Sequence, residues 1–580
     1  MPHNRVIAPF IWTIGRTVRG AVTVARSQAT ALPHALGGWR GGRGGALVAA
    51  AVLVIACVVL RWPAPEGMLT DNDWAHQLGG ANQILHGEHP FIDWRTDYGP
   101  LRYYPSALVQ RVFGPRTLAE LLLITTAYTI AYLLLFHLSW VASGRSLVSA
   151  ALLVVALMLL PRLYKYYVVL GPVVCLWMAW RYIERPTSTA LALLAAAVVA
   201  TGLFRADFGG FVGFASAVAV GTGPGTARER ITRLLHFAAL CLLLFAPWVL
   251  WLTLRGGLSG YFVDAFVVAP QHARAMSLPL PRFAPPLLEP GNAVFLLFVV
   301  VFLLPPMAFV VALRPGVCAD ACERRRIITT AVLAQAVLLH ASHRSDFWHL
   351  LQAMPVSYVL CAWLAGRALA YRHAASGLAR VAAGMGIGLF GLAVSASLWA
   401  ALHVAQWPSQ RAGEGLMMAG VHALPRGAMV ADLAAHHPDD AWLQAIQYVR
   451  HCTAATDRVV ALPPYISLYY FADRRLAGGQ VAWSPGFFSG PADQQRWVDT
   501  VRRQGAALVL GDASHMLDGR PECMFASYSP VITQYVTTEF TPIGAFGSVI
   551  VRAPGTGGPR LDGPPACVRG PAEKEGTSAR

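Results

Sequence analysis

Residues 68 to 101 read MLTDNDWAHQLGGANQILHGEHPFIDWRTDYGPL, a stretch crowded with acidic and histidine side chains. Two long apolar runs flank it, near residues 45 to 62 and 118 to 141. A polar insert between two apolar runs is typical of a loop that joins two membrane-spanning helices. We therefore expect this stretch to lie outside the hydrocarbon core, at the membrane surface.

The whole chain has the composition of a polytopic membrane protein. Of its 580 residues, 55% are apolar and only 13% are charged, and the mean hydropathy is +0.48. Runs long enough to cross about 30 Å of hydrocarbon recur along the chain and predict about eleven spans. These runs lie near residues 45 to 62, 118 to 141, 146 to 161, 166 to 183, 189 to 204, 208 to 223, 234 to 254, 291 to 313, 327 to 342, 350 to 371 and 381 to 406.

The formal net charge of +16 reflects membrane topology, and no nucleic-acid partner is expected. Arginines precede the first span and recur in alternate loops, which the positive-inside rule assigns to the cytoplasm. The N-terminus is therefore expected in the cytoplasm and, with an odd number of spans, the C-terminus outside a bacterial cytoplasmic membrane. The arginines concerned are Arg5, Arg16, Arg19, Arg26, Arg40, Arg43, Arg181, Arg185, Arg228, Arg230, Arg233, Arg314, Arg324, Arg325, Arg326, Arg372 and Arg380.

Four segments follow from this topology. We expect an Arg-rich cytoplasmic segment over residues 1 to 44, a transmembrane bundle over 45 to 406 with an external loop at 63 to 117, an external domain over 407 to 555, and a disordered tail over 556 to 580. In the external domain, VVALPP (459 to 464) and AALVLGD (506 to 512) are typical of buried strands, whereas ISLYYFADRR and PADQQRWVDTVRRQG are typical of helices. The predicted fold class is therefore mainly α, a polytopic helical bundle with a small external α/β domain.

The cysteines permit one external disulfide. Cys452 and Cys523 both fall in the predicted external domain, where an oxidising compartment allows them to pair. Whether they pair stays open from the sequence. Cys318 and Cys322 lie in a predicted cytoplasmic loop without companion ligands, so zinc is not expected there.

The start of the quoted stretch allows two interpretations. Thr70 followed by Asp71 and Asp73 is typical of a helix N-terminus, and Trp74, Leu78, Ala81 and Leu85 then recur at helical spacing before His86-Gly87 ends the helix. The acids would then only cap an amphipathic helix on the membrane surface or against the bundle. Alternatively, one of them is the general base for an acceptor hydroxyl at the outer membrane face.

The second half of the stretch, HPFIDWRTDYGPL, mixes acids and arginines around a Gly99-Pro100 turn. Carboxylates such as Asp93 could bind sugar hydroxyls, and Arg95 and Arg102 could bind a phosphate. An ordinary salt-bridged loop would have the same composition.

These residues carry a resemblance to a known superfamily. Asp71-x-Asp73, Leu85-x-Gly87, Pro90-Phe91-x-Asp93 and Tyr98-Gly99-Pro100-Leu101 follow one another in the first external loop after a single span. This order resembles the GT-C integral-membrane glycosyltransferases, in particular the bacterial relatives of protein O-mannosyltransferases and of the lipid A aminoarabinose transferase. The resemblance covers roughly residues 45 to 410.

The resemblance implies a reaction and its partners. Members of the superfamily take a sugar from a polyprenyl-phosphate carrier and transfer it outside the cytoplasmic membrane, with an acidic residue of the first loop implicated in catalysis. Asp73, or else Asp71, would be that catalytic carboxylate. The partners would be the lipid-linked donor, membrane lipid and an acceptor that is a glycan, a lipid or a protein.

Three further segments are candidate substrate sites. FRADFGG (204 to 210) resembles an R-x-D-x-G segment of the bacterial relatives, so Arg205 and Asp207 would face the same cavity; the alternative is a local ion pair at a helix end. RLYKYY (162 to 167) places Arg162 and Lys165 on the external side, against the positive-inside trend. They could hold the carrier phosphate or only anionic lipid.

HRSDFWHLLQAMP (343 to 355) is the third segment and resembles an R-x-D-x-x-H-L segment of those relatives. His343, Asp346 and His349 are three residues apart and could hold a divalent cation on one helical face. Phosphate binding by Arg344 and His349 is the favoured interpretation, and solvated polar residues at a helix end are the other. No metal site is therefore assigned, although a divalent cation stays possible.

Three classes of function remain. The favoured one is a polyprenyl-phosphate-dependent glycosyltransferase of the bacterial cell envelope, because its charged residues gather at the external ends of the spans. A transporter or flippase of a lipid-linked saccharide is the alternative, although a proton-coupled carrier would be expected to place ionisable residues in mid-membrane. A non-catalytic envelope scaffold is the third.

Overall fold

The computed structural model describes residues 42–286, 289–371, 377–405, 412–511 and 514–555, together with residues 565 and 567. The chain divides into a first unit, Met1–Leu53, and a second unit, Val54–Arg580. The predicted Arg-rich segment and the predicted disordered tail lie almost entirely outside the described residues. All elements below except the start of α3 (Gly42–Leu60) belong to the second unit.

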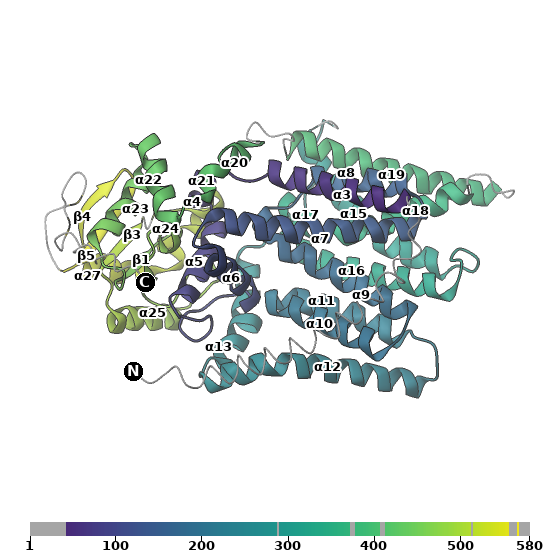
Figure 1. Cartoon of the computed structure of the whole chain (residues 1–580), viewed down its shortest axis with the longest axis horizontal. Helices are drawn as coiled ribbons and strands as arrows, with labels where there is room; N and C mark the ends of the chain where they lie inside the picture. Colours follow the sequence, from purple (N-terminus) through teal and green to yellow (C-terminus); the bar gives the residue numbers. More distant parts are fainter. Residues whose placement is uncertain are drawn as a thin grey trace. The chain divides into compact units, whose positions relative to one another are not determined.

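Helices cover all of the predicted apolar runs. After α3 they are α7 (Thr117–Ser143), α8 (Ser146–Met158), α9 (Tyr166–Glu184), α10 (Ser188–Phe204), α11 (Ala206–Gly221), α12 (Ala227–Leu254), α15 (Pro290–Leu313), α16 (Ala321–His343), α17 (Phe347–Ala353) with α18 (Pro355–Tyr371), and α19 (Gly377–His403). From α7 onward these helices run side by side (Figure 1). The predicted helical bundle is confirmed.

The predicted apolar runs form both long and short helices. Among the described residues, five helices are by themselves long and apolar enough to cross a membrane, or six if α17 and α18, bent by 63°, form one broken span. Polar breaks shorten the others: Gly144-Arg145 separates α7 from α8, and Arg205 separates α10 from α11. Helices α8, α10 and α11 therefore stay below the roughly 20 residues that a span needs.

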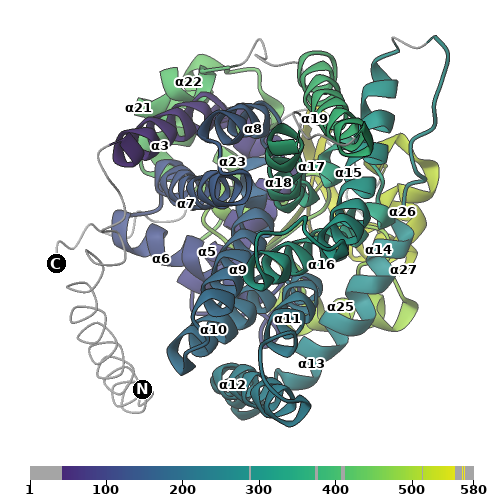
Figure 2. The ribbon, with the colours of Figure 1, turned by 90° about the vertical axis from the view of Figure 1, so that its right-hand side faces the viewer.

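Packing distinguishes central from peripheral helices. Helix α9 packs against α7, α10, α11 and α16, whereas α12 packs chiefly against α10 and α11, at the edge of the bundle in Figure 2. Leu242 and Leu243 of α12 remain 70% and 68% exposed. Helix α12 therefore has an exposed apolar face that is suited to contact with membrane lipid.

The first external loop folds into short helices: α4 (Pro65–Thr70), α5 (Asn72–Leu85), η1 (Pro100–Arg102) and α6 (Tyr104–Phe113). The cap of α5 is Asp71, whose Oδ1 accepts from the backbone N–H groups of Asp73 (2.8 Å) and Trp74 (3.3 Å). Thr70, the predicted cap, instead ends α4 and donates its hydroxyl to Glu66 O. The predicted end of the helix is confirmed, with His86 as its C-cap.

The C-terminal region is a small α/β domain, as predicted. Its sheet has the order β2-β1-β3-β5-β4, made of β1 (Arg458–Ala461), β2 (Arg475–Leu476), β3 (Leu508–Gly511), β4 (Phe540–Phe546) and β5 (Val549–Pro554). Strand β1 is parallel to β2 and β3, with Val459 opposite Leu508, and the β4–β5 hairpin adds antiparallel strands at one edge. The helices include α22 (Arg426–His436), α23 (Ala441–Cys452), α24 (Leu468–Phe471), α25 (Pro491–Gln504) and α27 (Pro530–Glu539).

The disulfide of this domain is not the pairing that the sequence left open. Cys452, the last residue of α23, is bonded to Cys567, with the two Cα atoms 5.1 Å apart. Cys523 is a free, buried thiol. A pairing of Cys452 with Cys523 is therefore wrong, and Cys523 packs as a small apolar side chain.

The polar face of α5 holds the domain against the bundle. Asn82 and Gln83 are completely buried, and their amides donate to Tyr469 O (2.7 Å) and Arg474 O (3.3 Å). His86 Nε2 lies 3.0 Å from an oxygen of Asp473, which also pairs with Arg426. Much of the polarity of the first loop therefore serves to dock the C-terminal domain.

Candidate functional site: one carboxylate shared by three cations

Asp73 lies in the first turn of α5 and is surrounded by positive charge. Its Oδ1 is 3.3 Å from Lys165 Nζ and 3.7 Å from Arg102 Nη2, and its Oδ2 is 3.7 Å from Arg162 Nη1. The hydroxyl of Tyr164 donates to Oδ2 at 2.9 Å. We call Asp73, Arg102, Arg162 and Lys165 the carboxylate cluster.

Two chain segments bring the cations to Asp73. Arg102 ends η1, where the Gly99-Pro100 turn redirects the chain, and its guanidinium is fully buried. Arg162 precedes and Lys165 ends the short η2 helix (Leu163–Lys165), directly before α9. Both residues, predicted to lie against the positive-inside trend, contact Asp73 of the first loop.

Tyr98 joins this cluster to a second one. Its hydroxyl accepts from Lys165 Nζ at 2.7 Å, and its ring lies 3.8 Å from Arg102 Cζ and 5.5 Å from Arg205 Cζ. The neighbouring Gly99 donates its N–H to Phe204 O at 3.1 Å and packs so closely on α10 that a Cβ would collide with Leu203. Glycine at this position therefore lets the first loop reach the break between α10 and α11.

The two first-loop acids have opposite electrostatic environments. Burial would raise the pKa of Asp73, but Lys165, Arg102 and Arg162 outweigh it and hold the pKa far below its usual range. The pKa of Asp71 is raised, first by burial and then by the Asp73 charge. Asp73 is thus held as a carboxylate, whereas Asp71 serves mainly as the cap of α5.

Arg205 and Asp207 form the second cluster together with His340. Arg205 Nε donates to Asp207 Oδ1 at 2.8 Å, and the other Asp207 oxygen is 3.7 Å from His340 Nδ1. Arg205 and Asp207 therefore form a local ion pair, and the Arg205 guanidinium also lies beside the ring of Tyr98 in the first loop.

His349 extends the second cluster toward the C-terminal domain. Its ring is 5.5 Å from that of His340, and its Nδ1 lies 2.8 Å from Asp346 Oδ1. Arg344 pairs with Asp346 at 2.9 Å and with Asp518 of the domain at 2.7 Å. Arg344 is therefore already neutralised by two carboxylates, which makes it a weaker phosphate ligand than the cations around Asp73.

Asp93 and Arg95 have other partners. Asp93 is exposed and accepts from the backbone N–H of His89 at 2.7 Å. Arg95 pairs with Asp264, the first residue of the η3 π-helix (Asp264–Val268), and with Asp493 of α25. The structure thus places these two residues at local and interdomain contacts rather than in the carboxylate cluster.

A metal site receives no support in the described part of the chain. No group of three or more His, Cys, Asp or Glu side chains is placed there to hold an ion. His349 and Asp346 bond to each other, and Asp346 is also taken by Arg344.

An apolar groove of about 480 Å³ begins beside the second cluster. It lies between α11, α15 and α16, where Gly210 follows Asp207 by one helical turn and Leu339 directly precedes His340. Its walls are Phe211, Phe214, Pro305, Pro306, Phe309, Ala331, Val332 and Ala336, and Gln335 is its one amide side chain. Phe214 and Leu339 are 64% and 48% exposed, so the groove faces the surroundings of the bundle.

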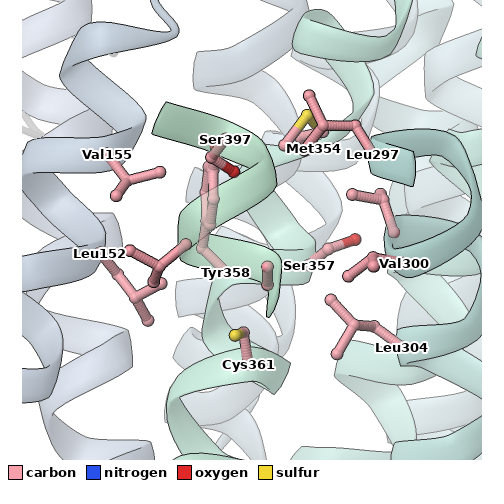
Figure 3. Close-up of a pocket in the computed structure, with 13 residues that line it drawn as sticks. Leu152, Val155, Leu297, Val300, Leu304, Met354, Ser357, Tyr358, Cys361 and Ser397 are labelled. Atoms are coloured by element: carbon pink, nitrogen blue, oxygen red, sulfur yellow. The ribbon is translucent and has the colours of Figure 1, made fainter. Parts of the chain in front are cut away.

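A second, closed pocket is too small for a substrate. It lies between α8, α15, α18 and α19 and is lined by apolar side chains with Ser357, Tyr358 and Ser397 (Figure 3). Its volume is about 20 Å³, room for one water molecule.

Several site residues were not predicted. Tyr164 and Tyr98 carry the hydrogen bonds between the charges, and His340 joins Asp207 to His349. The tyrosines had a local signal, because each lies next to predicted cations or in the Tyr98-Gly99-Pro100 turn. His340 lies inside an apolar run, where the sequence holds no comparable signal.

The chain has likenesses among solved structures but none among curated sequences or protein families. No protein-family model matches the chain. No curated protein matches its sequence. The chain is similar to the crystal structure of ArnT from Cupriavidus metallidurans bound to undecaprenyl phosphate, with a TM-score of 0.47 and 14% identity over 89% of this chain and 98% of that chain.

Proposed function

We propose that this protein transfers a sugar from a polyprenyl-phosphate carrier to an acceptor at the external face of the cytoplasmic membrane. The observation that carries the proposal is the carboxylate cluster. Three cations share one carboxylate there, and two of them are buried, since the side chains of Arg102 and Lys165 are 0% and 8% exposed. Such an excess of positive charge favours an anion, and a phosphate is the anion that a membrane-bound sugar donor would bring.

The hydrogen-bonding capacity of the cluster also suits a phosphate. Arg102 is fully buried, yet its Nε and Nη1 have no hydrogen-bond partner. Buried donors without partners are costly, so a ligand with several acceptor oxygens would be strongly favoured.

The apolar groove supports a lipid-linked donor. It is open to the surroundings of the bundle, and two of its lining residues, Gly210 and Leu339, lie on α11 and α16 within one helical turn of Asp207 and His340. A phosphate at the clusters and a prenyl chain in the groove would match the charged head and apolar tail of one molecule.

The chemistry assigns Asp73 the role of general base. The acceptor hydroxyl would attack the anomeric carbon, the carbon–oxygen bond to the phosphate would break with inversion, and Asp73 would take the hydroxyl proton. Arg102, Arg162 and Lys165 would stabilise the second negative charge that develops on the departing phosphate.

The second cluster is proposed to bind the sugar. Asp207 and Asp346 are carboxylates with partly exposed side chains, at 38% and 25%, and carboxylates accept hydrogen bonds from sugar hydroxyls. Arg205 and His349 orient these two acids through the contacts given above. Arg344 links the same cluster to the domain through Asp518.

The C-terminal domain is proposed to lie outside the cytoplasm. The disulfide between Cys452 and Cys567 supports this side, because disulfides form and persist in oxidising compartments. The same side then holds α5 and the carboxylate cluster, since α5 packs on α24 and β2 of the domain.

Mass spectrometry of polyprenyl-phosphate lipids tests the function. Cells that lack the protein, cells with wild type and cells with Asp73→Asn are compared, with Glu66→Gln as a control in the same loop. We expect one glycosylated carrier to accumulate in the deletion and in Asp73→Asn only, and its mass identifies the sugar. If neither strain accumulates such a carrier, the donor assignment is wrong, and translocation of a fluorescent carrier lipid would instead indicate a flippase.

A further inference from the structure

The three cations of the carboxylate cluster have a single acidic partner. Among the described residues, Arg102, Arg162 and Lys165 form ion pairs within 4.0 Å only with Asp73. Arg102 is fully buried, and the side chain of Lys165 is 8% exposed. Of the described carboxylates, only Asp73 therefore lies within ion-pair distance of these two buried cations.

Asp73 satisfies only part of the hydrogen-bonding capacity of the three cations. Its contacts with the arginines are 3.7 Å, longer than the 2.7–2.9 Å of a charge-assisted hydrogen bond. Its two oxygens face four donor groups, because the Tyr164 hydroxyl also donates to it. Arg102 Nε and Nη1 remain without a partner. A tetrahedral phosphate has more acceptor oxygens than a carboxylate and would satisfy more of these donors.

We propose that Asp73 is the internal counter-ion of Arg102, Arg162 and Lys165 before the donor binds, that the phosphate of the donor displaces it from these cations, and that only the displaced carboxylate acts as the base. This inference rests on the proposed function and adds to it a dependence of the base on donor binding.

The physical reason is a competition for the same charges. While three cations stabilise the carboxylate of Asp73, they also lower its tendency to accept a proton. Once a phosphate takes over these cations, its own negative charge lies beside Asp73 and favours protonation of the carboxyl group. The base therefore becomes strong only when a donor is present to react.

In the transfer step one bond to the anomeric carbon forms and another breaks. The acceptor oxygen bonds to the anomeric carbon as its proton passes to Asp73. The bond between that carbon and the phosphate oxygen breaks, and its electron pair stays on the phosphate, which becomes a dianion held by Arg102, Arg162 and Lys165. Tyr164 keeps Asp73 within reach, because its hydroxyl donates to Oδ2 and accepts from Arg162 Nη1, both at 2.9 Å.

Binding of a C15 prenyl monophosphate, with the C15 prenyl alcohol as reference, separates the possibilities. The full-length protein in detergent is titrated as wild type, Asp73→Asn and Asp73→Glu. The matched control is Glu66→Gln, because Glu66 is also in the first loop and its side chain is 33% exposed against 32% for Asp73.

We expect wild type to bind the phosphate more tightly than the alcohol, and Asp73→Asn to bind the phosphate at least about tenfold more tightly than wild type, since a competing charged contact is removed. Asp73→Glu and Glu66→Gln should keep the wild-type affinity. The prenyl phosphate should also raise the Tm of Asp73→Asn more than that of wild type, a readout that verifies folding of the variant.

The outcomes distinguish the inference from the function. If Asp73→Asn binds the phosphate as weakly as wild type or more weakly, Asp73 positions the cations rather than competing for them, and the inference is overturned while the proposed function stands. If wild type does not prefer the phosphate to the alcohol, the proposed function itself fails. An equal gain in phosphate affinity in Asp73→Asn and Glu66→Gln would also overturn the inference. The gain would then come from removing any negative charge in the first loop, and not from removing a competitor for the cations.

Discussion

Lys165 Nζ lies 3.3 Å from Asp73 Oδ1, although 92 residues separate the two along the chain. Asp73 belongs to the first loop and Lys165 directly precedes α9, so the contact joins two segments that are separated by α7 and α8. A buried ion pair costs desolvation and is a weak source of stability. The gathering of charge at this place is therefore better explained by a ligand site than by folding.

The first prediction concerns Asp73 itself. Asp73→Asn removes the proposed base, so transfer should fall on the order of 10²- to 10⁴-fold. Transfer is measured with isolated membranes and a lipid-linked donor, and the amount of protein is measured by immunoblot. Normal abundance with lost activity is expected, and Glu66→Gln should be active. Near-normal transfer in both Asp73→Asn and Asp71→Asn would remove the core of the proposal.

The second prediction concerns the cations. Lys165→Met removes one charged contact with the donor phosphate and should lower kcat/KM about 10- to 100-fold, the usual worth of a hydrogen bond to a charged group. Arg502→Gln is the control, since Arg502 is an exposed cation paired with Glu539 on the domain surface. An unchanged kcat/KM in Lys165→Met would exclude this lysine from donor binding.

The third prediction concerns the groove. Ala336 lines it and is only 9% exposed, so Ala336→Phe should fill part of the space for a prenyl chain. We expect kcat/KM to fall for a long-chain donor and to change little for a donor with one or two isoprene units. Leu242→Phe, on the exposed face of α12, should leave both unchanged. Equal loss with both donors would indicate damage to the bundle instead.

The fourth prediction concerns the disulfide. Cys452→Ala, Cys567→Ala and a reductant acting on wild type should lower the Tm of the C-terminal domain to the same extent, because each breaks the same bond. Removing a native disulfide costs about 2–5 kcal/mol in small secreted domains. Peptide mapping should show Cys452 joined to Cys567 and Cys523 alkylated only after unfolding. A smaller fall in Tm with the reductant than in the two variants would contradict loss of the disulfide as the shared cause.

The fifth prediction is a pH dependence of stability that depends on Asp264. Burial, only partly offset by Arg95, raises the pKa of this carboxyl from 3.8 to about 7. The folded protein then binds this proton more tightly than the unfolded chain. The stabilising contribution is complete below pH 3.8 and is lost as the pH rises through about 7.

The Tm measured between pH 4 and 8 checks this sign. The Tm of wild type should fall relative to that of Asp264→Asn across that window, because only wild type titrates at this position. Asp499→Asn, at a half-buried position on α25, should keep the wild-type pH dependence. A wild-type Tm that rises relative to that of Asp264→Asn would show that Arg95 outweighs burial.

Much of the fold was predictable because it depends on local pattern. Apolar runs specify helices wherever they occur, so α7, α9, α10 and α15 were found at nearly their observed bounds. Strands β1 and β3 and helix α25 were predicted for the same reason. The start of α12 was not, because its first two turns are polar and lie before the apolar run.

The sequence by itself determined that this is a membrane protein with an acidic first loop, unusual external cations at Arg162 and Lys165, and an α/β domain. Only the tertiary structure decided which charges meet. In the folded chain Asp73 contacts Arg102, Arg162 and Lys165. Arg95 forms ion pairs with Asp264 and Asp493, and Cys452 is bonded to Cys567. The reason is physical: helix formation depends on neighbours in sequence, whereas an ion pair or disulfide depends on how distant segments pack, which residue type and spacing do not encode.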